Sequence, residues 1–401
     1  MKFFLILFLF IPYLFANTLQ EAIDNAPPYS TLKLSSGIYL GSITIDKPIT
    51  IVGKNNDVII DGNGVDSVIY IESSHVTLKN LTITGSGNRM DKRDSAISIS
   101  KAKNCEISSC KITDALYGID MEMLSDSIIS NNYITSKKMQ MSLRGNALKL
   151  YYSHNNTIKN NIIEDSKDVT LNYSNNNIFK GNKFINNRFA THISLSDNNT
   201  FLNNIYKYNS VSIMLMGAKD TKVSNNTIVS SKGAAGIGVM IKGVSNLIFE
   251  NNSVKFNAKA LYIDGQEKAL GMKRYINNNE ISYNGEAIHF HAHIKDNTIT
   301  NNRIFGNIDD IVKDIDGGFH KSNIVEYNYW DRYEGFDIDN DNIGDTPHTV
   351  YQYADQLWHY NNKIKFFYAS PIMSLLNFLS NLAPFVEPNL IMEDTKPVFQ
   401  K

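Results

Sequence analysis

One short pattern occurs twice in the stretch NNTIKNNIIEDSKDVTLNYSNNNIFKGNKFINN, residues 155–187. Each copy has an apolar anchor, two polar residues, an asparagine, one further residue and a second apolar or aromatic residue. Copies follow one another from residue 76 to residue 330, and 21 to 29 residues separate successive anchors. The anchors are Leu78, Ile107, Ile129, Ile158, Phe179, Phe201, Val223, Phe249, Ile276, Ile299 and Val325. Self-similarity at this period indicates a solenoid in which each repeat forms one coil.

Asparagine has a fixed place in the repeat, three residues after the anchor. It tolerates the left-handed backbone region that a corner requires, and its amide can hydrogen-bond the backbone. The anchor and the second apolar residue then point inward, and asparagines on successive coils can form a hydrogen-bonded ladder. The nine asparagines are Asn132, Asn161, Asn182, Asn204, Asn226, Asn252, Asn279, Asn302 and Asn328, with Cys110 in the same place in an early copy. We therefore expect an all-β, right-handed parallel β-helix with coils roughly 4.8 Å apart.

The two ends of such a solenoid must be covered, because an open last coil would expose its core. We expect residues 17–75 to form an N-terminal cap and the first coils, with a short helix at Thr18–Asn25 and Thr18 as its N-cap. The strand-like segment STLKLSSGIYLGSITIDKPITIVG, residues 30–53, follows it. Residues 76–330 are assigned to the repeats. Residues 331–401 are assigned to an acidic loop, a helical cap and a tail.

The N-terminus has one basic residue, Lys2, and an apolar run from Phe3 to Phe15 before Ala16. Residues 1–16 are typical of a secretory signal peptide cleaved after Ala16, and we therefore expect an exported protein. Leu14 is larger than the residue usual at that distance from a cleavage site, so an uncleaved anchor is the alternative. The run is too short for a spanning helix of about 20 residues. Because no other stretch is long and apolar enough, we expect a soluble mature chain.

Charge and cysteine content exclude several classes of protein. The chain has 39 basic and 40 acidic residues, and removal of Lys2 with the leader leaves 38 against 40, a net charge of −2. Such a balance does not favour a nucleic-acid partner. Cys105 and Cys110 cannot form a disulfide scaffold, a CxxC redox motif or a four-cysteine zinc site.

The sequence resembles the NosD family over essentially the whole mature chain. Three segments are the most specific part of this resemblance. They are SLRGNALKLYY at 142–152, NYWDRYEGFDIDNDNIGDTP at 328–347 and ASPIMSLLNFL at 369–379. Ala147 stands where the family more often has glycine, and Tyr151 stands where tryptophan is more usual. The resemblance implies a periplasmic, non-enzymatic accessory protein that helps to assemble the copper centre of nitrous oxide reductase.

The resemblance also implies partners. They are the permease and ATPase subunits of an ABC transporter, a copper chaperone and nitrous oxide reductase, and contact with the membrane would be through the transporter. No nucleotide-binding loop occurs in this sequence, which agrees with an ATPase on a separate chain. The cargo is copper or sulfur, and the sequence alone does not decide between them.

Residue parity on the second strand of each coil separates core from surface. We expect an inward apolar set consisting of Ile193, Leu195, Ile213, Leu215, Val239, Ile241, Leu261, Ile263, Ile288 and Phe290. The outward set is then His192, Met214, Met216, Met240, Tyr262, His289, His291 and His293. Thioether and imidazole suit Cu(I), so we expect a transient copper site formed by the methionines and histidines of this set. The alternative is that these histidines are solvated or packed under a loop.

Other methionines and histidines are expected to have ordinary roles. Met121 and Met123 have the opposite parity and are predicted to fill the core. Met139 and Met141 lie in an insert, where they either fill gaps or bind copper transiently. The remaining histidines, predicted to be ordinary polar residues, are His75, His154, His320 and His359.

Asp337, Asp339, Asp341 and Asp345 alternate in the acidic loop. Carboxylates at this spacing can surround Ca²⁺, although Asn342 and His348 replace the glycine and glutamate of an EF-hand. A solvated acidic turn is the alternative.

The segment after Ala369 predicts a helix with Ser370 as N-cap and Pro371 in its first turn, ended by Pro384. Its apolar stripe either seals the last coil, which we favour, or docks on the transporter. The stripe consists of Ile372, Leu375, Leu376, Leu379 and Leu382.

Two rival functions remain. β-Helices commonly carry polysaccharide lyases or epimerases, whose chemistry needs converging carboxylates with a histidine or a basic residue. Asp120, Lys149, Asp168 and His192 are candidates, although the sequence predicts no compact cluster of them. The third possibility is a structural solenoid that binds no Cu(I).

Overall fold

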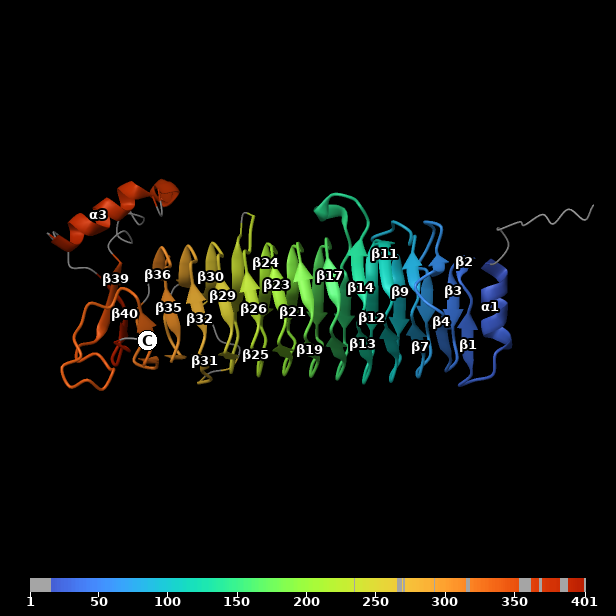
Figure 1. Ribbon diagram of the computed structural model, residues 1–401, viewed down its shortest axis with the longest axis horizontal. Helices are drawn as coiled ribbons and strands as arrows, with labels where there is room; N and C mark the ends of the chain where they lie inside the picture. The colour runs from blue at the N-terminus through green and yellow to red at the C-terminus, as the bar shows by residue number, and fades with distance from the viewer. Residues whose placement is uncertain are drawn as a thin grey trace, which may run out of the picture.

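A computed structural model shows a long rod built from parallel strands (Figure 1). It describes residues 16–233, 235–264, 269, 271–291, 293–314, 318–352, 362–367, 370–382 and 389–399. Three long sheets run along the rod: sheets A and B have 13 strands each and sheet C has 12. All pairs within them are parallel, and each strand pairs with the equivalent strand of the next coil. The predicted right-handed parallel β-helix is confirmed.

The strands of each sheet recur every third strand in chain order. Sheet A consists of β1 (Thr31–Leu34), β4 (Thr50–Gly53), β7 (Thr77–Lys79), β10 (Glu106–Ser108), β13 (Ile128–Ser130), β16 (Thr157–Lys159), β19 (Ile178–Lys180), β22 (Thr200–Leu202), β25 (Lys222–Ser224), β28 (Ile248–Glu250), β31 (Arg274–Asn277), β34 (Asn297–Thr300) and β37 (Ile324–Glu326). Sheet B consists of β2 (Gly37–Leu40), β5 (Val58–Asp61), β8 (Thr82–Thr84), β11 (Lys111–Ala115), β14 (Tyr133–Ser136), β17 (Ile162–Glu164), β20 (Lys183–Ile185), β23 (Ile205–Lys207), β26 (Thr227–Val229), β29 (Ser253–Lys255), β32 (Glu280–Ser282), β35 (Arg303–Phe305) and β38 (Tyr329–Trp330). Sheet C consists of β3 (Ile43–Ile45), β6 (Ile69–Ile71), β9 (Ser95–Ser100), β12 (Tyr117–Glu122), β15 (Leu148–Tyr151), β18 (Asp168–Asn172), β21 (Phe189–Ser194), β24 (Val211–Met216), β27 (Ile237–Lys242), β30 (Lys259–Asp264), β33 (Glu286–His291) and β36 (Asp309–Lys313).

The repeat places its two apolar residues on different sheets. Anchors lie on sheet A in register with one another, as Ile158 pairs with Phe179 and Phe179 with Phe201, and they are buried. The second apolar residues, such as Phe184, lie on sheet B and are buried as well. Aromatic rings stack between coils, with 4.8 Å between the ring centroids of Phe184 and Tyr206. The core is therefore one continuous apolar column inside the three sheets.

The nine predicted asparagines form one unbroken buried ladder at the corner between sheets A and B. The side-chain NH₂ of each donates to the side-chain oxygen of the next at 2.9 to 3.1 Å, from Asn132 to Asn328. The same oxygen accepts the backbone N–H of the preceding asparagine, as from Asn161 to Asn182 at 3.0 Å. Each NH₂ also donates to a backbone carbonyl of an earlier coil, as Asn182 does to Ile158 at 2.8 Å. Every polar atom of these amides thus has a partner inside the protein.

Two further ladders, which the sequence pattern did not predict, occupy the other corners. One runs through Asn156, Asn177 and Asn199, with 3.1 and 3.2 Å between the donating NH₂ and the accepting oxygen. The other contains Asn257, Asn284 and Asn307. All three corners therefore use the same amide chemistry.

The N-terminal end is covered by helix α1 (Ala16–Asn25), which contacts β2 and β3. Its side chains Leu19 and Ile23 are buried on the first coil. Since the helix begins at Ala16, Thr18 lies inside it, and the prediction of Thr18 as N-cap is wrong. The predicted start differs from the observed one by about two residues, which is a common difference at helix ends. The predicted strand-like segment forms β1 to β4. Residues 1–15, which hold most of the predicted signal peptide, lie outside the described residues.

The C-terminal end is covered by a two-stranded antiparallel ribbon, β39 (His348–Gln352) and β40 (Asn389–Asp394), rather than by the predicted apolar stripe. Asp394 of β40 accepts hydrogen bonds from the Asn328 NH₂ and from Trp330 Nε1, both at 2.9 Å, and so ends the first ladder. The His348 ring packs against Trp330 with 5.0 Å between centroids and 31° between the ring planes, and burial lowers the pKa of His348 to about 4. The last coil is therefore closed by a carboxylate and a neutral imidazole.

Helix α3 (Pro371–Leu382) projects beside this end (Figure 1). The Ser370 hydroxyl accepts from Met373 N–H at 3.3 Å, which confirms the predicted N-cap. The four described stripe residues, Ile372, Leu375, Leu376 and Leu379, are between 41% and 61% exposed. The prediction that these four seal the last coil is therefore wrong, because β40 already covers the core there. The Leu382 side chain and Pro384 lie outside the described residues.

Two short 3₁₀ helices complete the described elements, η1 (Met141–Leu143) and η2 (Asn362–Phe367). Within the described ranges, no helix has both the length and the apolar character needed to cross a membrane.

We expect Asn182→Ala to lower the free energy of unfolding by about 2–4 kcal/mol, because it leaves buried donors on Asn161 and the acceptors on Ile158 and Asn204 with fewer partners. Chemical denaturation measures the change. The control is Asn172→Ala on the outer face of sheet C, where the structure shows no hydrogen bond of this side chain with other described residues. Equal losses in the two variants would show that the ladder contributes nothing specific.

Candidate metal site

The outward residues of sheet C form one column in register. His192 pairs with Met214, Met214 with Met240, Met240 with Tyr262, and Tyr262 with His289. We call these five residues the sheet C column. Their predicted alignment on successive coils is confirmed.

Met216 and His291 lie in the neighbouring column, two residues further along their strands. Met216 pairs with Ser194 and Lys242, and His291 pairs with Asp264. The inward neighbours of both columns are buried as predicted, with one exception. Leu195 is 46% exposed and has a φ of 49°, so it lies at the corner where sheet C ends and not in the core.

The thioethers of the sheet C column are partly exposed. Met214 and Met240 are half-buried on neighbouring coils, which lie roughly 4.8 Å apart. His192, one coil before Met214, is also half-buried, and burial lowers its pKa, with the charge of Asp168 acting against this. Its Nε2 is buried and has no hydrogen-bond partner among the described residues. A neutral imidazole and two thioethers therefore face the same strip of surface.

His289 has a different environment. It is 5% exposed, its Nδ1 contacts the Glu286 carboxylate, and its Nε2 lies 3.1 Å from Asp314 Oδ2. Burial would lower the pKa of His289, but the nearby carboxylates of Asp314 and Glu286 outweigh burial and raise it. Tyr262 stacks on the ring at 4.9 Å. Nδ1 is therefore in use, whereas Nε2 lies beside the Asp314 carboxylate without forming a hydrogen bond, and a metal ion would have to displace one of these two carboxylates.

The three histidines of the predicted site fall into two groups. His291 Nδ1 lies 2.9 Å from Asp314 Oδ1, so His289 and His291 share one carboxylate. His293 instead lies against His320, with 3.3 Å between His293 Nδ1 and His320 Nε2. The sequence predicts an ordinary polar role for His320, because nothing in the pattern indicates that the next coil brings it beside His293. Copper binding by this set stays a prediction.

Three of the four acidic-loop residues converge. The ligand oxygens of Asp337, Asp339 and Asp341 all lie within 4.8 Å of one another, and in the described residues this is the one group of three or more His, Cys, Asp or Glu that does so. Asp345 instead accepts the backbone N–H of Ile338 at 2.6 Å. The pKa of Asp339 is raised: the backbone N–H of Asp341 lowers it, but desolvation and the neighbouring carboxylates outweigh that bond. The loop thus concentrates negative charge at one point.

The remaining methionines and histidines behave mostly as expected. Met121 is buried, whereas Met123 is 46% exposed, so its predicted place in the core is wrong. Met139 and Met141 are half-buried in the insert before β15. His154 Nδ1 accepts the Asn175 N–H at 3.0 Å. His75 packs against Tyr29, and His359 lies outside the described residues.

The candidates for sugar chemistry are held in ion pairs. Asp120 is buried and contacts Arg93 Nε at 2.6 Å and Lys149 Nζ at 3.3 Å, so Asp120 and Lys149 do meet on neighbouring coils, which the sequence did not predict. Asp168 is also buried and forms a two-pronged pair with Arg188. Each carboxylate is therefore occupied by a cation.

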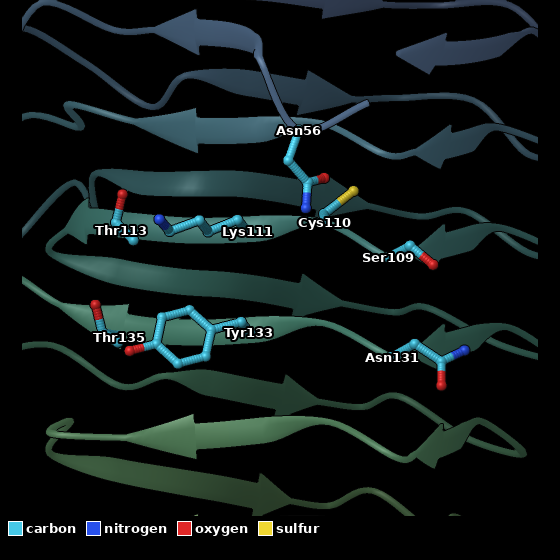
Figure 2. Close-up of a pocket in the computed structure, with 8 residues that line it drawn as sticks. All are labelled: Asn56, Ser109, Cys110, Lys111, Thr113, Asn131, Tyr133 and Thr135. Carbon is cyan, nitrogen blue, oxygen red and sulfur yellow. The ribbon is translucent and has the colours of Figure 1, made fainter. Parts of the chain in front are cut away.

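A shallow recess lies on sheet B, at its corner with sheet A (Figure 2). Its volume is about 590 Å³, and its lining includes Lys111, Tyr133 and the Asn56 turn. Cys110 lies at its edge but is buried, and burial raises the pKa of its thiol to about 12. Cys105 and Cys110 are both unbonded. This recess is on a different sheet from the methionines and histidines.

Comparison with known proteins gives one family. The family model described as "Periplasmic copper-binding protein (NosD)" matches residues 130–335, just over half of the chain. No curated protein matches the chain.

Solved structures share the β-helix. The A-module of the mannuronan C-5 epimerase AlgE6 from Azotobacter vinelandii has a TM-score of 0.58 and 14% identity, over 76% of this chain and 92% of that one. A tailspike protein of E. coli bacteriophage HK620 has a TM-score of 0.50 and 11% identity, over 80% of this chain and 62% of that one. At this identity the likeness concerns the fold alone.

Proposed function

Because the chain belongs to the NosD family of periplasmic copper-binding proteins, we propose that it is an exported accessory protein that receives Cu(I) and hands it on to the copper centre of nitrous oxide reductase. The protein itself is not an enzyme in this proposal. The polysaccharide alternative stays open, but the ion-paired carboxylates Asp120 and Asp168 do not favour it.

The observation that carries the proposal is the register of Met214 with Met240. Thioethers on neighbouring coils are close enough to share one ion, and thioether is a ligand that selects Cu(I). His192, which lies one coil before Met214 and has an unpartnered ring nitrogen, supplies a third donor. Met216 lies two residues after Met214 on strand β24, beside these three donors. Half-exposed ligands suit an ion that is bound and then released.

Docking is the second part of the proposal. An ABC transporter, with permease and ATPase on other chains, and a copper chaperone are the partners. Helix α3 offers the transporter an apolar surface, because Leu375 and Phe378 are 57% and 58% exposed and Met373 is buried on the opposite side. Exposed apolar patches of this kind mark interaction sites.

Replacing Met214, Met216 and Met240 together by leucine should weaken Cu(I) binding at least tenfold, since leucine keeps the volume but removes the sulfur. Competition with a Cu(I) chelator under anaerobic conditions measures the affinity. Thioether does not titrate, so this site should persist at pH 5, whereas any histidine contribution should weaken there. Leucine at Met90 and Met123, two exposed methionines on earlier coils, is the control. Unchanged affinity in the triple variant would refute the copper role of these methionines.

Leu375→Ser with Leu379→Ser should abolish co-purification with the permease and ATPase subunits from detergent extracts, because both exposed side chains lose apolar surface. The fold should be unaffected, since neither residue is buried. The control is Val65→Ser with Ile308→Ser, two residues exposed to a similar degree elsewhere. Retained co-purification of the α3 variant would place the docking surface elsewhere.

Calcium is proposed as a second, structural ligand. If Asp337, Asp339 and Asp341 bind Ca²⁺, millimolar calcium should raise the melting temperature and a chelator should lower it, by linkage of binding to folding. Asp339→Asn with Asp341→Asn should remove the response, and exposed Asp91→Asn should not. A chelator that leaves the melting temperature of the wild type unchanged would leave the loop as a solvated acidic turn.

A further inference from the structure

Two imidazoles face each other at the surface, close to the C-terminal end of sheet C. His293 Nδ1 and His320 Nε2 are 3.3 Å apart, the ring centroids are 5.2 Å apart, and the rings are inclined by 76°. Both side chains belong to exposed residues. In the described part of the chain, neither ring is paired with a carboxylate.

The backbone that carries these rings is fixed. Ile294, directly after His293, is buried and forms a parallel bridge with Phe319, directly before His320. The His320 N–H donates to the Ile294 carbonyl at 3.0 Å, and the Asn323 side chain donates to the carbonyls of Ile294 and His320 at 2.6 and 2.7 Å. The two histidines are thus presented by neighbouring coils on a preorganised backbone.

A structural role explains this pair poorly. One exposed hydrogen bond between two imidazole rings contributes about 1 kcal/mol or less to stability. The pair differs in this respect from His289, which is enclosed by two carboxylates and a stacked tyrosine. In one tautomer, one of the two facing nitrogens carries a proton. When that ring carries its proton on the other nitrogen instead, both facing nitrogens have a free lone pair, and the two lone pairs point toward each other.

We propose that His293 and His320 form an entry site that takes up one Cu(I) ion between their facing nitrogens. The proposal rests on the copper function proposed above and deepens it. Imidazole suits copper, and Cu(I) accepts two nitrogen donors on opposite sides. The pair is exposed, whereas the residues next along the strand become progressively more enclosed.

The site has a defined place relative to the sheet C column. His293 follows His291 on the same chain segment, and His289 of that segment pairs with Tyr262, which pairs with Met240. The order from the exposed end is therefore the imidazole pair, the Asp314-linked histidines, Tyr262 and then the methionines. The helix proposed to dock on the transporter lies at the same end of the rod (Figure 1).

The test counts Cu(I) ions on the full mature protein by anaerobic chelator competition. His320→Gln and His293→Gln should each bind one ion fewer than the wild type, and His320→Cys, which restores a copper ligand, should recover it. The Met214, Met216 and Met240 leucine variant should keep this ion. Its X-ray absorption spectrum should then show nitrogen neighbours and no sulfur.

The control is His75→Gln, an exposed histidine near the opposite end of the rod, which should keep the wild-type stoichiometry. Melting temperatures should be unchanged in all single-histidine variants, which separates lost binding from lost folding. Full stoichiometry in His320→Gln, or equal loss in His75→Gln, would overturn the entry site. If the imidazole pair binds its ion but no copper is transferred to nitrous oxide reductase, the result would count against the proposed function and not against the entry site.

Discussion

Every coil of this rod depends on the next one to satisfy its buried amides. Asn161 has its backbone N–H and its side-chain NH₂ bonded to Asn182, and Asn182 is bonded in the same way to Asn204. A buried amide without a partner costs free energy comparable with that of a lost hydrogen bond, so spacing and register between coils are tightly fixed. This register, set at the corners, also places the outer face of sheet C. Because the corners do not slip, a methionine on one coil faces a methionine on the next.

The outer face of sheet C changes character along the rod. Between Asp120 and Arg188 the charged residues form ion pairs that neutralise them, and the uncharged Thr170 separates Lys149 from His192. From His192 onward they are an imidazole, two thioethers and an aromatic ring, none with a formal charge at neutral pH when His192 is deprotonated. Beyond Tyr262 the ionic cluster around Asp314 begins. The imidazole and thioether side chains thus occupy a stretch of sheet C between two groups of ion-paired residues. Within this stretch no carboxylate of the column competes with them for a metal ion.

The sequence determined the repeating part of the structure well because period and parity are local properties. The anchors, the nine ladder asparagines and the alignment of His192 with Met214 and Met240 follow from spacing alone. Errors arose where chain direction changes or where partners come from distant segments. Leu195 and Met123 follow the parity of their strands but lie at corners with positive φ. His320, Asp314 and Asp394 belong to other coils or to the tail, and no local pattern shows that they reach His293, His289 and Asn328. The α3 stripe is exposed for the same reason, since β40 returns from the tail to cover the core.

The ladder is directional, and only its two ends differ from the rest. Each internal amide presents the same acceptor to the coil before it and the same donor to the coil after it, so one coil is chemically equivalent to another. Gene segments that encode whole coils can therefore be duplicated or deleted without creating a new unsatisfied amide. Evolution can therefore change the length of the rod one coil at a time. The distance between the entry end and the methionines changes with it. Asp394, whose carboxylate accepts from the last asparagine, is the residue such events must leave in place, whereas the first asparagine is bonded by the backbone N–H of Cys110 and makes no demand on that side chain.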